Sequence, residues 1–323
     1  NLGAAVSRPD KLVKRVIPNL FRNLYFKIHK KYHLAIEPDF YYHIFMKFLE
    51  LNDVSFAYPP VEGDVDENGK PVESKPVFEH FSAELPSGFV SFVGQNGCGK
   101  TTLLMLCSGR LKPDSGSVNL LGQNPYLLGQ EQKNLLASVI YQNMEFESED
   151  KVSELLSQVY SNGNLKGNAK GINSDSDLLS EVVDVFELKN VLGHGLMQLS
   201  KGEIQRVLLA FSILYGSATV FMDEPLFAME EYQKENALAY LKDFVHKTGT
   251  SIYISMHELD LTKKYADQVL LFYPNRDMSL GTPDEVLTRE DIEKAYGVPY
   301  AMLKNHENIS RDYLKSVSEI MKK

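Results

Sequence analysis

The sequence predicts an α/β fold in which helices cover a mainly parallel sheet. From about position 48, short apolar runs of strand length alternate with segments of helical periodicity, as in parallel strands linked by helices. A glycine-rich segment at 94–99 joins one such strand to a helical run, and another strand ends at two acids, 223 and 224. The predicted strands are 48–56, 78–85, 89–93, 117–121, 138–141, 219–222, 251–255 and 268–272.

Composition limits the class of protein and its partners. The chain has 323 residues, of which 43% are hydrophobic and 24% charged, so it is neither collagen-like, disordered nor stapled by disulfides. Its net charge of -9 would repel a phosphate backbone, and nucleic acid is not expected as a main partner. Cys98 and Cys107 lack metal or redox spacing, which favours an intracellular location. No run approaches the roughly 18 apolar residues that span a bilayer, so any membrane contact should be peripheral.

Residues 1–45 differ from the rest of the chain. They carry eight Lys and Arg residues against three acids, and aromatic residues crowd positions 21–45. The chain begins with Asn1, whereas Met46 directly precedes the first strand-like run. Our hypothesis is that Met46 is the natural start and that residues 1–45 are not native. The alternative is a basic, aromatic segment that contacts anionic lipid; the organisation of a signal peptide is missing.

Beyond this segment, the alternating pattern indicates one domain over residues 46–298, followed by a helical tail over 299–323. Two polar stretches interrupt the pattern, at 61–75 and 161–177. They are rich in turn-forming residues, and we interpret both as solvated loops and not as functional sites.

The strongest motif is the segment from Gly94 to Thr102, which has the pattern Gly, four residues, Gly, Lys and Thr. Glycines let successive backbone N–H groups surround phosphate oxygens, and the following helix adds its positive end. The lysine should reach the β- and γ-phosphates, and Thr101 should bind Mg²⁺. A glycine-rich turn with a surface lysine is the bland alternative, but the strand before and the helix after argue against it. Cys98 should contribute its backbone, with a reactive thiol as the alternative. The predicted binding residues are Gly94, Asn96, Gly97, Cys98, Gly99, Lys100, Thr101 and Thr102.

Asp223 and Glu224 follow the apolar strand 219–222 directly. Both carboxylates should therefore lie at the carboxyl end of a buried strand, where α/β sheets bind ligands. Asp223 suits a place around Mg²⁺, in its second shell of ligands, and Glu224 suits the general base that activates the attacking water. The alternative is a pair of acids that complements a helix dipole.

These two motifs occur in many nucleotide hydrolases, and the segment 199–207 distinguishes among them. It reads Leu-Ser-Lys-Gly-Glu-Ile-Gln-Arg-Val, and it resembles the signature motif of ATP-binding cassette (ABC) ATPases. Physically, Ser200 and Gly202 begin an amphipathic helix, and Glu203 completes the spacing of a capping box. In the family this helix start faces the γ-phosphate bound by another subunit. The resemblance therefore implies a nucleotide-sandwich dimer with a second copy or a paralogue.

The resemblance extends over most of residues 46–298 and implies further site residues. Tyr58 matches the aromatic residue that stacks on adenine. Gln142 matches the glutamine that contacts Mg²⁺ and the attacking water and passes the state of the site to the transporter. His257 matches the histidine that holds the γ-phosphate. The alternatives are a half-buried strand tyrosine, a loop glutamine and a structural histidine.

For the fold, the resemblance implies a P-loop NTPase (RecA-like) core with an antiparallel β portion near the N-terminus and an inserted helical subdomain at about 143–206. The sequence departs from the family in two places. Lys201 replaces the first glycine of the signature, and residues 226–230 replace a loop of small residues that ends in Asp. The second change puts communication between the two sites of a dimer in doubt more than hydrolysis.

Segments 256–267 and 281–298 resemble importer ATPases for iron-siderophores, haem and cobalamin. That branch implies ATP and Mg²⁺ as cofactors and a peripheral position on the cytoplasmic face of the cell membrane. It also implies an integral membrane permease as partner and, indirectly, an extracytoplasmic substrate-binding protein. The alternatives are a soluble ABC ATPase without a transport role, or the ATPase of an importer or exporter for another substrate. The transported substrate is chosen by the permease and is not encoded in this chain.

Overall fold

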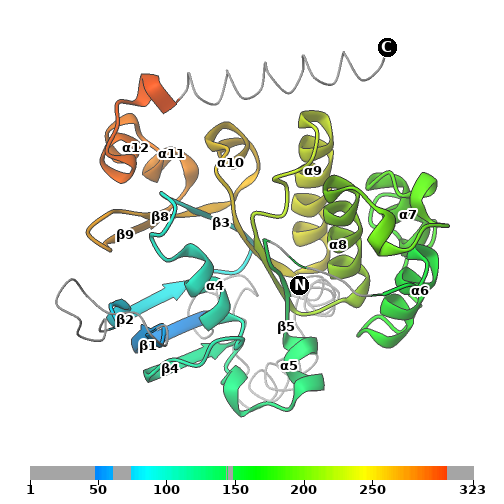
Figure 1. Ribbon diagram of the computed structural model, residues 1–323, viewed down its shortest axis with the longest axis horizontal. Helices are drawn as coiled ribbons and strands as arrows, with labels where there is room; N and C mark the ends of the chain where they lie inside the picture. Colours follow the sequence, from blue (N-terminus) through cyan, green and yellow to red (C-terminus); the bar gives the residue numbers. More distant parts are fainter. Residues whose placement is uncertain (1–47, 61–73, 143, 145–147, 304–323) are drawn as a thin grey trace, which may run out of the picture.

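The computed structural model describes residues 48–60, 74–142, 144 and 148–303 (Figure 1). The hypotheses about residues 1–45 lie outside this part, as do most of the loop 61–75 and residues 304–323 of the expected C-terminal tail. Of that tail, residues 300–303 have helical backbone. None of the helices in the described part is long and apolar enough to cross a membrane.

A six-stranded sheet forms the centre of the molecule, in the order β5-β6-β7-β3-β8-β9. Strand β3 shows why the parallel strands of this sheet are mostly apolar. Phe89 and Val93 face one core, whereas Val90 and Phe92 face the other. Both faces are buried, as expected for parallel strands covered on two sides. The strands are β3 (Phe89–Val93), β5 (Ala137–Ile140), β6 (Thr219–Asp223), β7 (Ser251–Ser255) and β8 (Gln268–Phe272), all parallel, and β9 (Met278–Gly281), antiparallel to β8.

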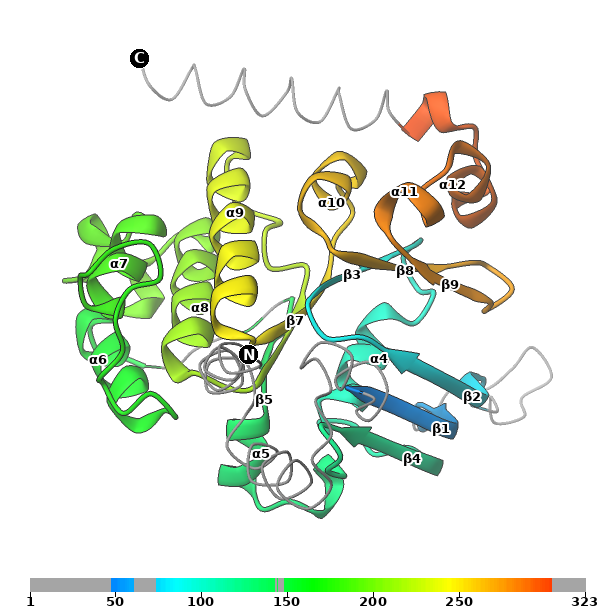
Figure 2. The same cartoon turned by 180° about the vertical axis from the view of Figure 1, so that it is seen from behind.

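A second, antiparallel sheet lies near the N-terminus of the described chain, as predicted. Its strands are β1 (Leu49–Ala57), β2 (Pro76–Leu85) and β4 (Ser115–Leu120), in the order β2-β1-β4. Helix α4 (Lys100–Cys107) lies between the two sheets (Figure 2), and its Leu103, Leu104 and Leu106 are buried in the core that they share. This packing fixes the start of α4 at the end of β3.

The opposite face of the central sheet is covered by α8 (Lys201–Tyr215), α9 (Glu231–Thr248) and α10 (Leu259–Tyr265). Helices α6 (Val152–Asn162) and α7 (Leu178–Val185) pack outside α8 and α9, away from the sheet (Figure 1). They lie within the segment expected to be helical. The remaining helices are α5 (Gln130–Leu136), α11 (Pro283–Val286), α12 (Arg289–Tyr296) and the 3₁₀ turns Pro125–Leu127, Lys189–Val191 and Leu196–Gln198.

The polar loop before α7 is anchored by a buried carboxylate. Glu181 is 7% exposed, and its carboxylate accepts hydrogen bonds from the backbone N–H groups of Ile172 (2.8 Å) and Asn173 (3.1 Å). Ser174 and Tyr240 donate to the same carboxylate at 2.9 and 3.0 Å. Buried charge is tolerated when its oxygens are fully hydrogen-bonded. The loop therefore has a defined conformation although its composition is that of a solvated segment.

All eight predicted strands are present, and β9 and α5 are two of the short elements that were not predicted. Strand β9 is a four-residue edge strand with no fully buried side chain, and α5 buries only Leu136. Periodicity requires several buried positions before it becomes visible, so neither element leaves a pattern in the sequence.

Candidate nucleotide-binding site

The loop between β3 and α4 has a backbone that requires glycine. Gly97 has φ of 79°, although a side chain there would meet open space, so its backbone angle alone favours glycine. Gly99 has φ of 106° and precedes α4, whose start has no side-chain cap. The first N–H groups of an uncapped helix lack partners within the helix, and they suit an anion such as phosphate.

Lys100 is 5% exposed and lies across this loop. Its ammonium group donates to the carbonyl oxygens of Gly94 and Gln95 at 2.8 and 2.9 Å. Burial lowers the pKa of Lys100, while the Cys98 thiol and the carboxylates of Glu224 and Asp223 act in the opposite direction. The structure thus holds a buried cation beside the uncapped helix start and close to the two acids.

Asp223 and Thr101 come together although they are far apart in the sequence. The Thr101 hydroxyl donates to Asp223 Oδ2 at 2.7 Å, and the Ser255 hydroxyl donates to Asp223 Oδ1 at 2.6 Å. Ser255 also accepts a hydrogen bond from the backbone N–H of Glu224 at 2.9 Å. Sequence reasoning missed Ser255. The available signal was its position at the end of a strand that neighbours the acid-bearing strand.

The oxygen atoms gathered here suit Mg²⁺, which prefers one or two carboxylate or hydroxyl ligands together with substrate phosphates. Thr101 and Asp223 present such oxygens side by side. Within the described residues, no group of three or more His, Cys, Asp and Glu side chains could hold a metal without further ligands. The donor set therefore fits a metal that arrives with a phosphate ligand.

Glu224 is held by the two side chains that the resemblance assigned to the same reaction. His257 Nε2 lies 2.6 Å from Glu224 Oε1, and Gln142 Nε2 donates to Oε2 at 2.7 Å. The hydrogen bond with His257 is the largest cause that lowers the pKa of Glu224. Glu224 has a left-handed backbone with φ of 46°, which is uncommon for a residue with a side chain. These three residues follow β5, β6 and β7, three neighbouring parallel strands.

Tyr58 lies just beyond β1 and beside the first turn of α4, which follows the loop 94–99. Its hydroxyl is 3.1 Å from Thr102 Oγ1, and its ring packs edge-on against Phe56 with 5.0 Å between ring centroids. The side chain is 46% exposed, so an aromatic surface is available next to the loop. Its role in adenine stacking stays a prediction.

Cys98 turns its side chain into the loop. A Cβ atom added to Gly94 would lie 3.0 Å from the Cys98 Sγ. Burial raises the pKa of the Cys98 thiol, with Lys100 acting against it. Because the thiolate is the nucleophilic form, these features favour the backbone role over a reactive thiol.

The start of α8 has the predicted capping box. Ser200 donates to Glu203 Oε2 at 2.7 Å, and the backbone N–H of Ser200 reaches the same oxygen at 2.8 Å. Lys201 is exposed at the first helical position, so its presence in place of glycine disturbs no packing. At Gly202, by contrast, a Cβ would lie 2.5 Å from the carbonyl oxygen of Ala228. Gly202 therefore has a packing role, because the unusual loop 226–230 lies directly against it.

Comparisons with known proteins agree with these features. Residues 78–227 match the family model described as ABC transporter. The hemin import ATP-binding protein of Escherichia coli O157:H7 is 27% identical over 248 residues, which cover 74% of this chain and 93% of that protein. The petrobactin import ATP-binding protein of Bacillus subtilis (strain 168) is 27% identical over 226 residues, or 69% and 87% of the two chains. A dimeric ATP-binding cassette bound to ADP and phosphate has the same fold, with a TM-score of 0.56 and 20% identity over 69% of this chain and 93% of that one.

Proposed function

We propose that this chain, which contains an ABC transporter ATPase domain, binds and hydrolyses ATP to drive uptake through a membrane permease. One observation carries the hydrolytic part: Glu224 lies at the end of β6, bonded to both His257 and Gln142, next to the buried Lys100 and the Thr101–Asp223 pair. A base, an electrophile-binding cation and oxygen ligands are the parts that phosphoryl transfer to water requires.

In this proposal the loop 94–99, the start of α4 and Lys100 bind the phosphates of ATP, and Tyr58 stacks on adenine. Thr101 and Asp223, with Gln142 nearby, would hold Mg²⁺, which neutralises charge on the phosphate oxygens. The lysine must exchange its hydrogen bonds with Gly94 and Gln95 for bonds to phosphate. Those two carbonyl oxygens hold its ammonium group at the loop before it meets the substrate.

Glu224 takes a proton from the attacking water in this mechanism. A base is most effective when its pKa lies near the working pH, whereas the bond from His257 lowers the pKa of Glu224. If His257 turns to the γ-phosphate, that bond is lost and the pKa of Glu224 rises. Arrival of the substrate would thus strengthen the base at the moment when it is needed.

The complete site requires a second molecule, because Ser200 and Gly202 bind the phosphate held by another subunit. We propose a nucleotide-sandwich dimer with a second copy or a paralogue. The capping box fixes the start of α8, and Ser200 is exposed. The backbone N–H groups at the start of α8 and the dipole of this helix are suited to the γ-phosphate held by the partner.

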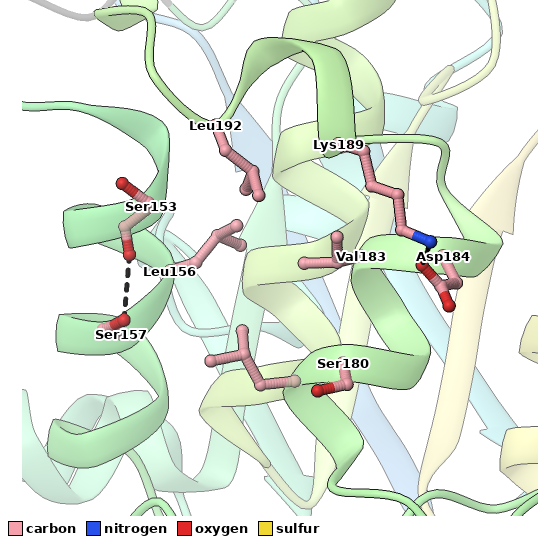
Figure 3. Close-up of a pocket in the computed structure, with 9 residues that line it drawn as sticks. Ser153, Leu156, Ser157, Ser180, Val183, Asp184, Lys189 and Leu192 are labelled. Carbon is pink, nitrogen blue, oxygen red and sulfur yellow. Dashed lines mark hydrogen bonds and ion pairs between the residues drawn. The ribbon is translucent and has the colours of Figure 1, made fainter.

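The permease would dock on the cytoplasmic side, against the helices that follow Gln142 in the chain. A cavity of about 380 Å³ opens between α6 and α7 (Figure 3). Leu156, Val183 and Leu192 provide its apolar lining, and the ion pair of Lys189 with Asp184 (2.6 Å) borders it. An apolar groove with a charged rim suits a short amphipathic segment of another protein. The chain would then be peripheral to the membrane.

The transported substrate is proposed to be an iron-siderophore, haem or cobalamin. The similarity to the hemin and petrobactin import ATP-binding proteins supports this range. An extracytoplasmic binding protein would deliver the substrate to the permease and contact this chain only indirectly.

The hydrolytic role is tested with Glu224→Gln, which keeps the shape of the side chain and removes the base. Turnover of Mg-ATP should fall by at least about a hundredfold, since general-base catalysis contributes 10²–10⁴. Binding of a fluorescent ATP analogue should be unchanged. Wild-type turnover in this variant would show that Glu224 is not the base.

The transport role is tested by co-expression with the permease encoded nearest to this chain. The pair should co-purify, and Val183→Arg, which places a charge in the cavity between α6 and α7, should prevent it. Asp243→Ala on the surface of α9 serves as the control. An ATPase that stays active but binds no permease would instead favour a soluble role without transport.

A further inference from the structure

Glu187 joins helices that carry different parts of the proposed site. It follows α7 and has a left-handed backbone with φ of 53°. Arg206 of α8 donates from Nη1 to the carbonyl oxygens of Phe186 (3.1 Å) and Glu187 (3.0 Å), and approaches Glu187 Oε2 at 3.5 Å. The Arg206 side chain is 11% exposed. The residue after α7 is therefore fixed to the helix that begins with Ser200.

The same carboxylate oxygen of Glu187 also binds the first turn of α9. Tyr232 donates its hydroxyl to Oε2 at 3.1 Å, and Gln233 donates from Nε2 at 2.8 Å. Gln233 in addition accepts from the backbone N–H of Glu230 at 3.3 Å, so it caps the helix at the point where the loop ends. Hydrogen bonds to an ionised acceptor are stronger than those between neutral groups.

The loop 225–230 spans the distance between Glu224 and this helix start, and it rests on α8. The backbone N–H of Ala228 donates to Gln205 Oε1 at 2.8 Å, and the Ala228 carbonyl oxygen lies against Gly202. Leu226 and Met229 are buried on either side. One end of the loop thus adjoins the proposed base, and its middle touches the helix start that is proposed to bind the phosphate of a partner.

We propose that Glu187 is a positioning residue. It keeps the site around Glu224 and the helix start at Ser200 at a fixed position relative to each other. By fixing the first turn of α9 to α8, it holds the loop against Gly202 and Gln205, and so sets the start of α8 relative to Glu224. The inference rests on the proposed dimer, because only there does each chain serve two nucleotides. Within the described residues, the carboxylate of Glu187 is hydrogen-bonded to Arg206, Tyr232 and Gln233, and these bonds reach neither the loop 94–99 nor Glu224.

The test uses Glu187→Ala in a Glu224→Gln background, in which ATP is bound and not consumed. Light scattering with Mg-ATP measures the dimer dissociation constant, and a fluorescent ATP analogue at low protein concentration measures binding to the monomer. Glu187→Ala should weaken the dimer by about tenfold or more, as expected for the loss of hydrogen bonds to a charged group. Monomer binding should be unchanged. A residue important only for folding would lower both affinities together.

Three further variants and one control complete the test. Tyr232→Phe and Gln233→Ala each remove one donor to Glu187 and should each give part of the loss, and Glu187→Gln should restore part of it because it retains an acceptor oxygen. Asp243→Ala, which breaks a surface ion pair with Lys247 on α9, is the control and should change neither affinity.

The outcomes separate this inference from the proposed function. If Glu224→Gln dimerises and Glu187→Ala dimerises equally well, the positioning role is wrong while the dimer stands. If Glu187→Ala loses monomer binding and its cooperative melt as well, Glu187 is a folding residue and the inference is also wrong. If Glu224→Gln itself stays monomeric with Mg-ATP, the proposed dimer fails, and this inference fails with it.

Discussion

The proposed nucleotide site, which we call the half-site, contains the loop 94–99, Lys100, Asp223 and Glu224. It is built in a different way from the helix start at Ser200 in the same chain. The half-site is assembled from the ends of four adjacent parallel strands, β5, β6, β7 and β3, and side chains from different strands bind one another. The helix start depends on local bonds between Ser200 and Glu203. The first is organised by the core of the fold, whereas the second takes its local shape from a helix cap. A substitution should therefore be able to damage either one and leave the other intact.

The largest expected effect comes from Ser200→Arg. A long, bulky side chain would stand where the partner's γ-phosphate must approach, and dimerisation of the Glu224→Gln protein should weaken by roughly a hundredfold or more. ATP binding to the monomer should be spared, because it depends on Tyr58 and Lys100. Light scattering with and without Mg-ATP measures the change. Equal dimer fractions in the two proteins would contradict the sandwich arrangement.

Lys100→Ala makes the converse test. It removes the buried cation of the half-site, and the affinity of the monomer for Mg-ATP should fall by about 10- to 100-fold, since bonds to charged groups are the stronger ones. The capping box of α8 should be unaffected. Titration with a fluorescent ATP analogue and a thermal melt distinguish lost binding from lost folding. Binding that equals the wild type would remove Lys100 from the site.

The difference between the two regions also explains how much the sequence could predict. An apolar strand followed directly by acids or by a glycine-rich loop can be identified as part of a ligand site from the sequence. Parallel strands bury both faces, and α/β sheets bind ligands at the carboxyl ends of such strands. Asp223, Lys100 and the cap at Ser200 were therefore predictable as local patterns. The parallel strands β3, β6, β7 and β8 were predictable for the same reason, since each shows an apolar run.

Contacts between distant segments could not be predicted in this way. Nothing local to Ser255 or Gln205 indicates that the first will bind Asp223 or that the second will bind Ala228. These pairs follow from strand order and helix packing, which one sequence does not reveal. The anchoring of the polar loop by Glu181 is a further example, because the same composition also fits a loop that packs on nothing.

A smaller effect is expected in the pH dependence of the half-site. The hydrogen bond from His257 lowers the pKa of Glu224, so in the free enzyme the carboxylate persists to lower pH than it otherwise would. His257→Ala removes this cause, and the pKa of Glu224 should rise. The acid limb of kcat/KM, which reports the free enzyme, should then move to higher pH.

The acid limb of kcat should move less in the same variant, because kcat reports the complex with substrate, in which His257 is proposed to face the phosphate. Rate profiles of the wild type and His257→Ala from acid to neutral pH give both quantities. A shift of the kcat/KM limb to lower pH would contradict the assigned cause. Equal shifts in both limbs would mean that His257 stays on Glu224 throughout turnover.

The smallest effect is expected for Cys98→Ala, which separates the backbone of the phosphate loop from its side chains. The Cys98 thiol is partly buried against Gly94, and its pKa is raised, so we expect neither a nucleophile nor a phosphate ligand at this position. Affinity for Mg-ATP and turnover should stay within about twofold of the wild type, the range of substitutions that remove no specific interaction. Labelling with a thiol reagent should be slow in the wild type at neutral pH, and a loss of turnover beyond tenfold in Cys98→Ala, at an unchanged melting temperature, would show that the thiol itself takes part. An unchanged affinity would exclude the thiol as a phosphate ligand and would be consistent with binding by the main chain of this loop.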